Sequence, residues 1–176
     1  WRKAEYDDDA WPSGKSYLGR ATSRQKYKMA TTLKMGATTF YFRKVFDFDP
    51  PAGGGELQIR FLIDDGAVFY LNGKQIHRVN MKERGSIRYT TRALSTVIDA
   101  KLSGQITLPG KLLKQGKNIL AVEVHQYSTN DRDLAFGLSL HATVESLPDG
   151  IILNELMAAN RGSVTHADTN PDWIEL

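Results

Sequence analysis

The chain contains 176 residues, and its 23 lysines and arginines slightly outnumber its 20 aspartates and glutamates. This length suits one domain of ordinary size, or one domain together with a piece of another. A charged fraction of 24% and an aromatic fraction of 10% argue against a disordered chain. The absence of cysteine excludes a disulfide scaffold, a cysteine-based zinc site and a cysteine nucleophile. No apolar run is long enough to predict a membrane span.

Alternating apolar residues predict a succession of β-strands. Phenylalanines at 40, 42, 46 and 48 share one face of a strand over 40–48, and a second strand is expected over 57–63. Asn72-Gly73 predicts a tight hairpin between 67–71 and 74–77, because a type I′ turn needs a positive φ at both central residues. Further strands are expected over 106–108, 119–125 and 136–144, with short strands in the loops of 80–104 and a polar loop at 126–133. Many short strands without a convincing helical period predict an all-β sandwich or barrel.

The organisation of the chain is expected to change near residue 147. Residues 147–150 (Leu-Pro-Asp-Gly) have the composition of a linker, so a first domain is expected over 1–146 and a new unit over 151–176. A chain that starts at Trp1 and stops just after a strand-like segment is expected to be a piece of a longer protein.

The positive charge is concentrated near the start of the chain. Residues 1–46 hold ten lysines and arginines against four acidic residues, and the excess lies mostly in 15–34. This stretch is either a solvated loop or a patch for an anionic partner, such as a sulfated or uronic polysaccharide. Nucleic acid is not expected as a partner, because no RNA-recognition, zinc-finger or helix-turn-helix pattern accompanies the charge.

Five separated motifs resemble, in order, those of a galactose-binding-like jelly roll. They lie at 6–11, 18–19, 39–44, 64–74 and 116–126. The segments 152–160 and 172–176 look like the opening of a bacterial lamin-tail domain, which is an immunoglobulin-like sandwich. The expected fold class is therefore an all-β jelly-roll sandwich over 1–146, followed by a truncated immunoglobulin-like segment over 151–176.

The resemblance implies a non-catalytic module of a larger secreted or cell-surface bacterial protein. Relatives of this kind often bind glycans through loops at one end, and many carry a structural calcium ion. We therefore expect a carbohydrate-binding accessory module, whose partners are a polysaccharide or glycan, including anionic ones, and other domains of the same chain. The alternative is a spacer that serves structure or protein–protein interaction without binding glycan, because a fold alone does not give a function.

Two acidic clusters are candidate ligands of a structural Ca²⁺ ion. Asp64 and Asp65 precede a glycine before a strand, and Asp7 and Asp8 lie on an early loop. Carboxylates on a turn present the oxygen ligands that Ca²⁺ prefers, and the first pair is similar to an Asp-Asp-Gly motif that binds calcium and sugar in anthrax-antigen-type lectin domains. The alternative is that Asp64 and Asp65 cap backbone N–H groups in a bend, and that the charges of Asp7 and Asp8 are solvated.

The polar loop at 126–133 holds the best candidate glycan ligands. Sugars stack their C–H faces on aromatic rings and pair their hydroxyls with planar polar groups. The loop supplies both kinds of group, and the segment 80–92 adds an aromatic ring and a guanidinium. The candidate residues are Tyr127, Asn130, Asp131, Arg132, Tyr89 and Arg88, with Tyr17 and Tyr27 of the basic loop as further partners. An ordinary polar loop is the alternative.

Glu123 and His125 are two residues apart on a predicted strand and should therefore point the same way. Such a pair could ligate a metal or exchange protons, but no third ligand or nucleophile is evident nearby. The alternative is a hydrogen-bonded structural pair that anchors the 126–133 loop. The chain also lacks a nucleophile elbow and a phosphate-binding loop. We therefore expect no enzymatic activity.

Overall fold

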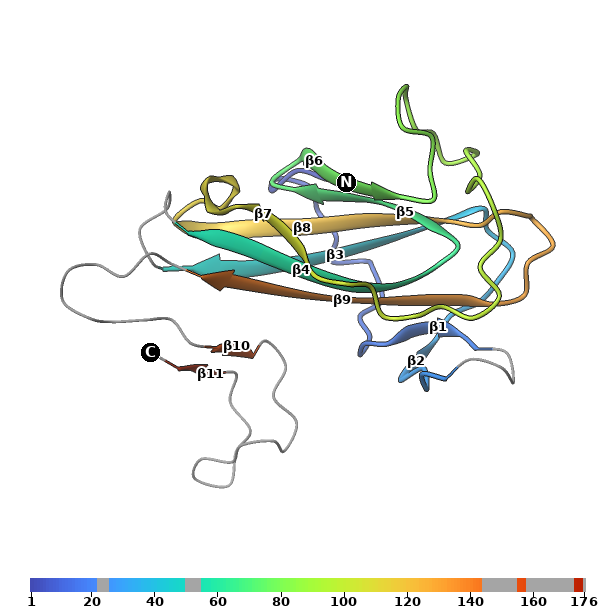
Figure 1. The fold of residues 1–176 in the computed structure, drawn as a ribbon, viewed down its shortest axis with the longest axis horizontal. Coiled ribbons are helices and arrows are strands. Elements are labelled where there is room, and N and C mark those ends of the chain that lie inside the picture. The colour runs from blue at the N-terminus through green and yellow to red at the C-terminus, as the bar shows by residue number, and fades with distance from the viewer. Residues whose placement is uncertain (22–25, 50–54, 144–154, 158–172, 176) are drawn as a thin grey trace.

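The structure, a computed structural model, describes residues 1–21, 26–49, 55–143, 155–157 and 173–175. The regular structure of this part of the chain consists mainly of two β-sheets that pack face to face (Figure 1). Among the described residues the only helical element is a 3₁₀ turn, η1 (Gly110–Leu112). The all-β sandwich predicted from the sequence is therefore confirmed. No helix in this part of the chain is long and apolar enough to cross a membrane.

The first sheet has five strands in the order β2-β1-β9-β4-β7. Their bounds are β1 (Leu18–Arg20), β2 (Thr31–Thr32), β4 (Glu56–Asp64), β7 (Ile106–Pro109) and β9 (Leu134–Thr143). β4 and β9 form its long antiparallel centre. β1 and β2 lie in the basic stretch and were not predicted from the sequence, because strands this short leave no periodic pattern.

The second sheet has four strands in the order β3-β8-β5-β6. Their bounds are β3 (Thr39–Phe48), β5 (Gly66–Leu71), β6 (Lys74–Val79) and β8 (Gly116–His125). Asn72 and Gly73 join β5 to β6 with φ angles of 52° and 81°, so the predicted hairpin is confirmed. Residues 80–104 contain no strand, only an isolated bridge between Leu102 and Leu62, so the short strands expected there were wrong.

The main core lies between the two sheets. Phe61 and Ile63 of β4 and Phe136 of β9 belong to one buried cluster with Phe69 of β5. Phe42 of β3 stacks on Phe136 with ring centroids 4.0 Å apart. Because burial of each large apolar side chain contributes about 1.5–3 kcal/mol, this cluster is the main force that holds the sheets together.

The outer face of the second sheet is covered as well. Its outward side chains form a second buried cluster with the first residue of the chain and with the segment that follows β6; the members are Val68, Tyr70, Ile119, Ala121, Met81, Ala93, Trp1 and Ile87. Trp1 meets Tyr41 and Tyr70 edge-on, with centroids 4.7 and 5.7 Å apart. β8 is consequently buried on both faces from Asn118 to His125. The segment after β6 is thus held against the sheet.

The end of the chain contributes β10 (Glu155–Met157) and β11 (Trp173–Glu175), which pair antiparallel as a separate two-stranded sheet. The expected linker 147–150 and most of the expected lamin-tail segment 151–176 lie outside the described residues. The division of the chain into these units therefore stays a prediction.

Candidate functional site

Two segments that are far apart in the sequence meet at one end of the sandwich. β4 and β8 end there and β5 and β9 begin there, at the right of Figure 1. The segments 88–98 and 126–133 lie at this end, and the backbone N–H of Ala93 donates to the carbonyl of Gln126 at 3.2 Å. These two segments, together with Asp64 and Asp65, are called the loop end below.

Asp65 holds both segments of the loop end in place. Its Oδ1 accepts a hydrogen bond from the backbone N–H of Val97 at 2.6 Å, and its Oδ2 accepts one from the backbone N–H of Tyr127 at 2.7 Å. The side chain is buried, and two N–H groups that would otherwise lack partners are satisfied by it. Asp65 therefore acts as the backbone cap that the sequence offered as the alternative to a calcium ligand.

Asp64, the neighbour of Asp65, is buried and carries a proton at neutral pH. Burial, the hydrogen bond to Asp65 and the negative charges of Asp65, Asp133 and Asp131 raise the pKa of Asp64 to about 9. Burial also raises the pKa of Asp131 and of Asp133. The proton on Asp64 removes the repulsion that two adjacent buried carboxylates would otherwise have without a counter-ion.

The four predicted calcium ligands are not assembled into one site. Asp8 forms an ion pair with Arg43 of β3 at 2.8 Å, and Asp7 caps the backbone N–H of Asp9 at 3.0 Å, whereas Asp64 and Asp65 lie at the end of β4. Among the described residues no group of three or more histidine or acidic side chains is placed to hold a metal ion.

One buried oxygen at the loop end nevertheless has the chemistry of a calcium ligand. Gln126 donates from its Nε2 to the carbonyl of Asp133 at 2.7 Å, and its Oε1 is buried without a hydrogen-bond partner. The oxygen atoms are therefore of the type that Ca²⁺ prefers, but the carboxylates are not arranged around one site. Calcium binding stays a prediction of the resemblance.

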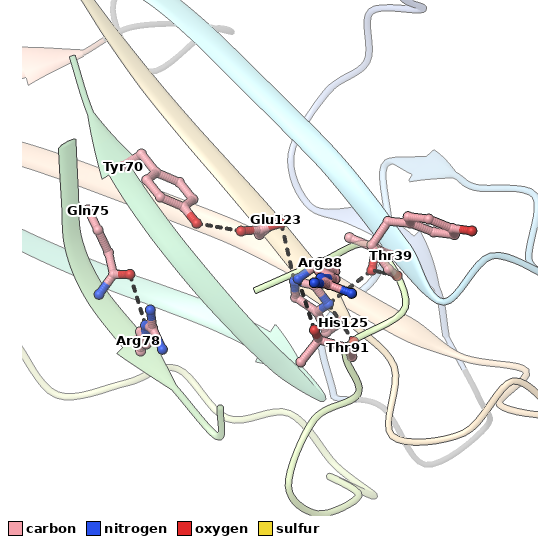
Figure 2. A network of polar contacts seen from close by, with 9 residues as sticks. Thr39, Tyr70, Gln75, Arg78, Arg88, Thr91, Glu123 and His125 are labelled. Carbon is pink, nitrogen blue, oxygen red and sulfur yellow. Dashed lines mark hydrogen bonds and ion pairs between the residues drawn. The ribbon is translucent and has the colours of Figure 1, made fainter. Parts of the chain in front are cut away.

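Glu123 and His125 form the centre of a buried polar network under the loop end (Figure 2). The Tyr70 hydroxyl donates to Oε1 of Glu123, and Oε2 of Glu123 lies 3.4 Å from Nε2 of His125. On the other side of the ring, Nδ1 lies 2.8 Å from the carbonyl oxygen of Thr91 and 2.9 Å from Oγ1 of Thr39. The pair anchors residues 89–91, whereas the sequence had suggested 126–133.

The neighbours of His125 determine where its protons lie. A carbonyl only accepts, and the Thr39 hydroxyl donates to the carbonyl of Tyr89 at 2.6 Å, so Nδ1 of His125 must carry hydrogen. If Nε2 carried no hydrogen, its lone pair would face the Glu123 carboxylate, and two hydrogen-bond acceptors would then lie side by side without a donor. Glu123 and His125 therefore form a buried ion pair only when Nε2 carries hydrogen as well.

The state of Glu123 agrees with this pair. Burial acts to raise its pKa, but hydrogen bonds from His125 and Tyr70 and the charges of His125 and Arg2 outweigh burial and hold the pKa below its ordinary value. His125 is fully buried, so the pair has no access to a substrate and acts by positioning the backbone of the loop end.

The structure brings the predicted glycan ligands to the same end of the sandwich. Five of the six are exposed there: Tyr127, Asn130 and Arg132 on one segment, and Arg88 and Tyr89 on the other. Asp131 instead accepts the backbone N–H of Ser128 at 2.7 Å and is half-buried, so it shapes the loop.

Sequence reasoning missed three exposed residues of the same surface. Arg92 lies close enough to Asp131 for its charge to act on that carboxyl group, and Leu94 and Ile98 are 57% and 61% exposed. A charge count would have found the arginine, because five of the six charged residues between 78 and 92 are basic. Nothing in the local pattern marks the two aliphatic residues as exposed.

Comparison with known proteins adds no assignment. No protein-family model, curated protein or solved structure matches the chain. The galactose-binding-like resemblance therefore stays an expectation, and the function is argued from the loop end.

Proposed function

We propose that the chain is a non-catalytic carbohydrate-binding module and that the loop end binds the glycan. The observation that carries this proposal is the convergence of two distant segments, each with an exposed tyrosine beside exposed cationic groups. Tyr89 is 69% exposed and Tyr127 is 45% exposed, and Arg88, Arg92 and Arg132 are exposed beside them.

These side chains have the properties that a sugar needs. The C–H face of a pyranose stacks on an aromatic ring, and a guanidinium or amide pairs with two adjacent hydroxyls through a planar pair of hydrogen bonds. Tyr89 and Tyr127 supply the rings, and Arg88, Arg132 and Asn130 supply the planar groups.

The backbone under these side chains is fixed before any ligand arrives. Thr39 and His125 hold the carbonyls of Tyr89 and Thr91, and Asp65 holds the N–H of Tyr127. A preformed site loses less conformational entropy when the ligand binds, which raises affinity. This supports recognition by the loop end over a role as an unstructured loop.

The strand order supports the finer part of the proposal, the jelly roll. One sheet contains β1-β9-β4-β7 and the other β3-β8-β5-β6, so successive strands of these eight lie in opposite sheets except at the β5–β6 hairpin, in the manner of two Greek keys. The motifs that resemble galactose-binding-like modules add the proposal that the chain belongs to a larger secreted or cell-surface bacterial protein.

A glycan array tests the proposal, run once with calcium and once with EDTA. For a glycan that binds, Tyr127→Ala combined with Arg132→Ala should weaken binding about 30-fold or more, because even one residue at the centre of an interface contributes about 2 kcal/mol or more. Tyr6→Ala, at a tyrosine that is 39% exposed outside the loop end, is the matched control and should change binding less than twofold. Unchanged binding in the loop-end variant would overturn the proposal.

A second candidate function is a protein-contact or spacer module. The observation that favours it is the exposure of Leu94 and Ile98, since aliphatic side chains bind proteins more readily than sugars. Two results together would favour this second function. The first is a glycan array, including sulfated and uronic glycans, on which the chain binds nothing. The second is that Leu94→Ser combined with Ile98→Ser abolishes a contact between this domain and another domain.

A further inference from the structure

A cavity outside the loop end lies between the basic stretch and the segment that precedes β7. It has a volume of about 310 Å³ and is lined by Lys26, Tyr27, Asp99, Ala100, Lys101 and Leu102. This size is at the lower limit of small-molecule sites, which span roughly 300–1,000 Å³, so it suits one small unit of a larger ligand.

Both walls of the cavity are fixed by the fold. On one side, the backbone of Leu102 bridges to Leu62, and the N–H of Ser103 donates to the carbonyl of Phe61 at 2.8 Å. On the other side, Tyr27 packs with Tyr17 in a cluster built on Leu62, Ala100 and Ala135, with the two tyrosine rings 5.4 Å apart. The cavity is therefore preformed.

The lining combines cationic, acidic and apolar groups. Lys26 and Lys101 are exposed, and neither they nor Asp99 take part in an ion pair within the described residues. The Nζ of Lys26 lies 5.9 Å from the centre of the Tyr27 ring. Four further exposed cations, Lys15, Arg20, Lys28 and Lys34, belong to the same stretch as Lys26 and give that stretch a positive field. Such a field attracts anions and raises their rate of encounter.

The combination indicates a particular class of ligand. A simple inorganic anion would use the lysines but would be repelled by Asp99. A sugar with a carboxylate or sulfate group uses all of them, because its anionic group pairs with the lysines and its hydroxyls donate to Asp99. Its C–H face can meanwhile lie against Tyr27 and Leu102.

We propose that this cavity binds one anionic sugar unit, bearing a carboxylate or a sulfate, of the glycan that the loop end holds. The inference rests on the proposed carbohydrate binding and adds selectivity for charge. The basic stretch, which the sequence left open between a solvated loop and an anion-binding patch, thereby receives a specific role.

The test measures binding of a defined pair of probes by isothermal titration. Oligogalacturonate carries one carboxylate per ring, and its methyl ester has the same rings without the charge. Lys26→Gln combined with Lys101→Gln should weaken oligogalacturonate binding about tenfold and should leave binding of the methyl ester unchanged. The tenfold value takes into account that solvent screens exposed charges. A sulfated oligosaccharide forms a second arm that distinguishes sulfate from carboxylate.

The control variant, Lys111→Gln with Lys117→Gln, removes the same charge from exposed lysines in η1 and at the start of β8. It should change binding less than twofold. If both double variants lost oligogalacturonate binding equally, the attraction would be unspecific and the inference would be overturned.

The outcomes also separate this inference from the proposed function. Binding of neutral glycans without any preference for either anionic probe would overturn the cavity inference alone. Loss of anionic binding only in Tyr127→Ala with Arg132→Ala would assign the charge selectivity to the loop end and would likewise overturn it. No glycan binding of any kind would overturn both.

Discussion

Asp64→Asn should stabilise the protein at neutral and alkaline pH, whereas the same change at Asp65 should destabilise it. Asp64 is buried, and its pKa is raised to about 9 in the folded state, against about 3.9 for an aspartate in an unfolded chain. Between these two values the side chain must take up a proton when the chain folds. An asparagine needs no proton, so the variant avoids this cost.

The magnitude follows from the difference in proton binding. Each pH unit above the unfolded pKa lowers the folding stability of the wild type by about 1.4 kcal/mol, which gives a ceiling of about 4 kcal/mol at pH 7. The introduced amide leaves an N–H without a partner beside Asp65, at about 1–3 kcal/mol. The net gain for Asp64→Asn at pH 7 is therefore about 1–3 kcal/mol. The stability that comes from the Asp64 proton is fully present below about pH 4, falls as pH rises and levels off above about pH 9.

Asp65→Asn has the opposite sign because both carboxylate oxygens of Asp65 accept backbone hydrogen bonds. An amide retains only one acceptor, so the N–H of either Val97 or Tyr127 loses its partner. An unsatisfied buried donor costs about 1–3 kcal/mol. The two neighbouring positions thus serve as controls for each other, since the substitution is identical.

Urea unfolding in EDTA at about pH 5, 7 and 8.5 measures both effects. The stability difference between Asp64→Asn and the wild type should widen with pH. Asp65→Asn should destabilise the protein most at pH 5 and less at higher pH, because it also removes a charge that raises the pKa of Asp64. If Asp64→Asn were destabilising at pH 8.5, or if its effect did not depend on pH, the assignment of the proton to Asp64 would be refuted.

Three further predictions concern the network, the first sheet and calcium. Glu123→Gln should cost about 1–3 kcal/mol, because it replaces the charged acceptor of the buried Tyr70 hydroxyl with a neutral one. Since the pKa of Glu123 is lowered, its contribution is present above about pH 4.3 and lost as pH falls through the folded value; urea unfolding from pH 7 to pH 3 measures both, and an unaffected variant would contradict the pairing. Gly19→Ala would place the new Cβ 1.9 Å from the carbonyl oxygen of Leu134, so β1 should detach from β9. The melting temperature should then fall by several degrees. An unchanged melting temperature would contradict this packing of Gly19. If calcium binds at Asp64, calorimetry in two buffers should detect a released proton that Asp64→Asn abolishes, and the absence of any calcium heat would contradict the prediction.

The sequence predicted the long strands because each of them carries a local pattern. The phenylalanines of β3 alternate, and Asn72-Gly73 requires a particular backbone, so both follow from a few adjacent residues. β8 was predicted as a strand with two distinct faces, yet nothing in its own residues shows that Trp1 and residues 80–95 cover the outer face. That cover depends on contacts between segments far apart in the chain.

The candidate site was predictable in composition but not in arrangement. Tyrosines, arginines and an asparagine in two loops lead to the hypothesis of a sugar-binding surface, whichever way the loops fold. Their meeting at one end depends on Asp65, which reaches both Val97 and Tyr127, and on His125, which reaches Thr91. A sequence gives the chemistry of these side chains but not their partners, so Asp65 could equally be interpreted as a metal ligand.

β8 belongs to two cores at once, and this gives the loop end an uneven mobility. An amide in a strand covered on both faces exchanges its hydrogen only when the whole domain opens, so the N–H groups of 118–125 should be the slowest to exchange. Gln126 follows this strand directly, and His125 at its end fixes the backbone of 89–91. The tyrosine rings can therefore reorient in solvent on a fast timescale while the main chain beneath them keeps its place for the lifetime of the folded state.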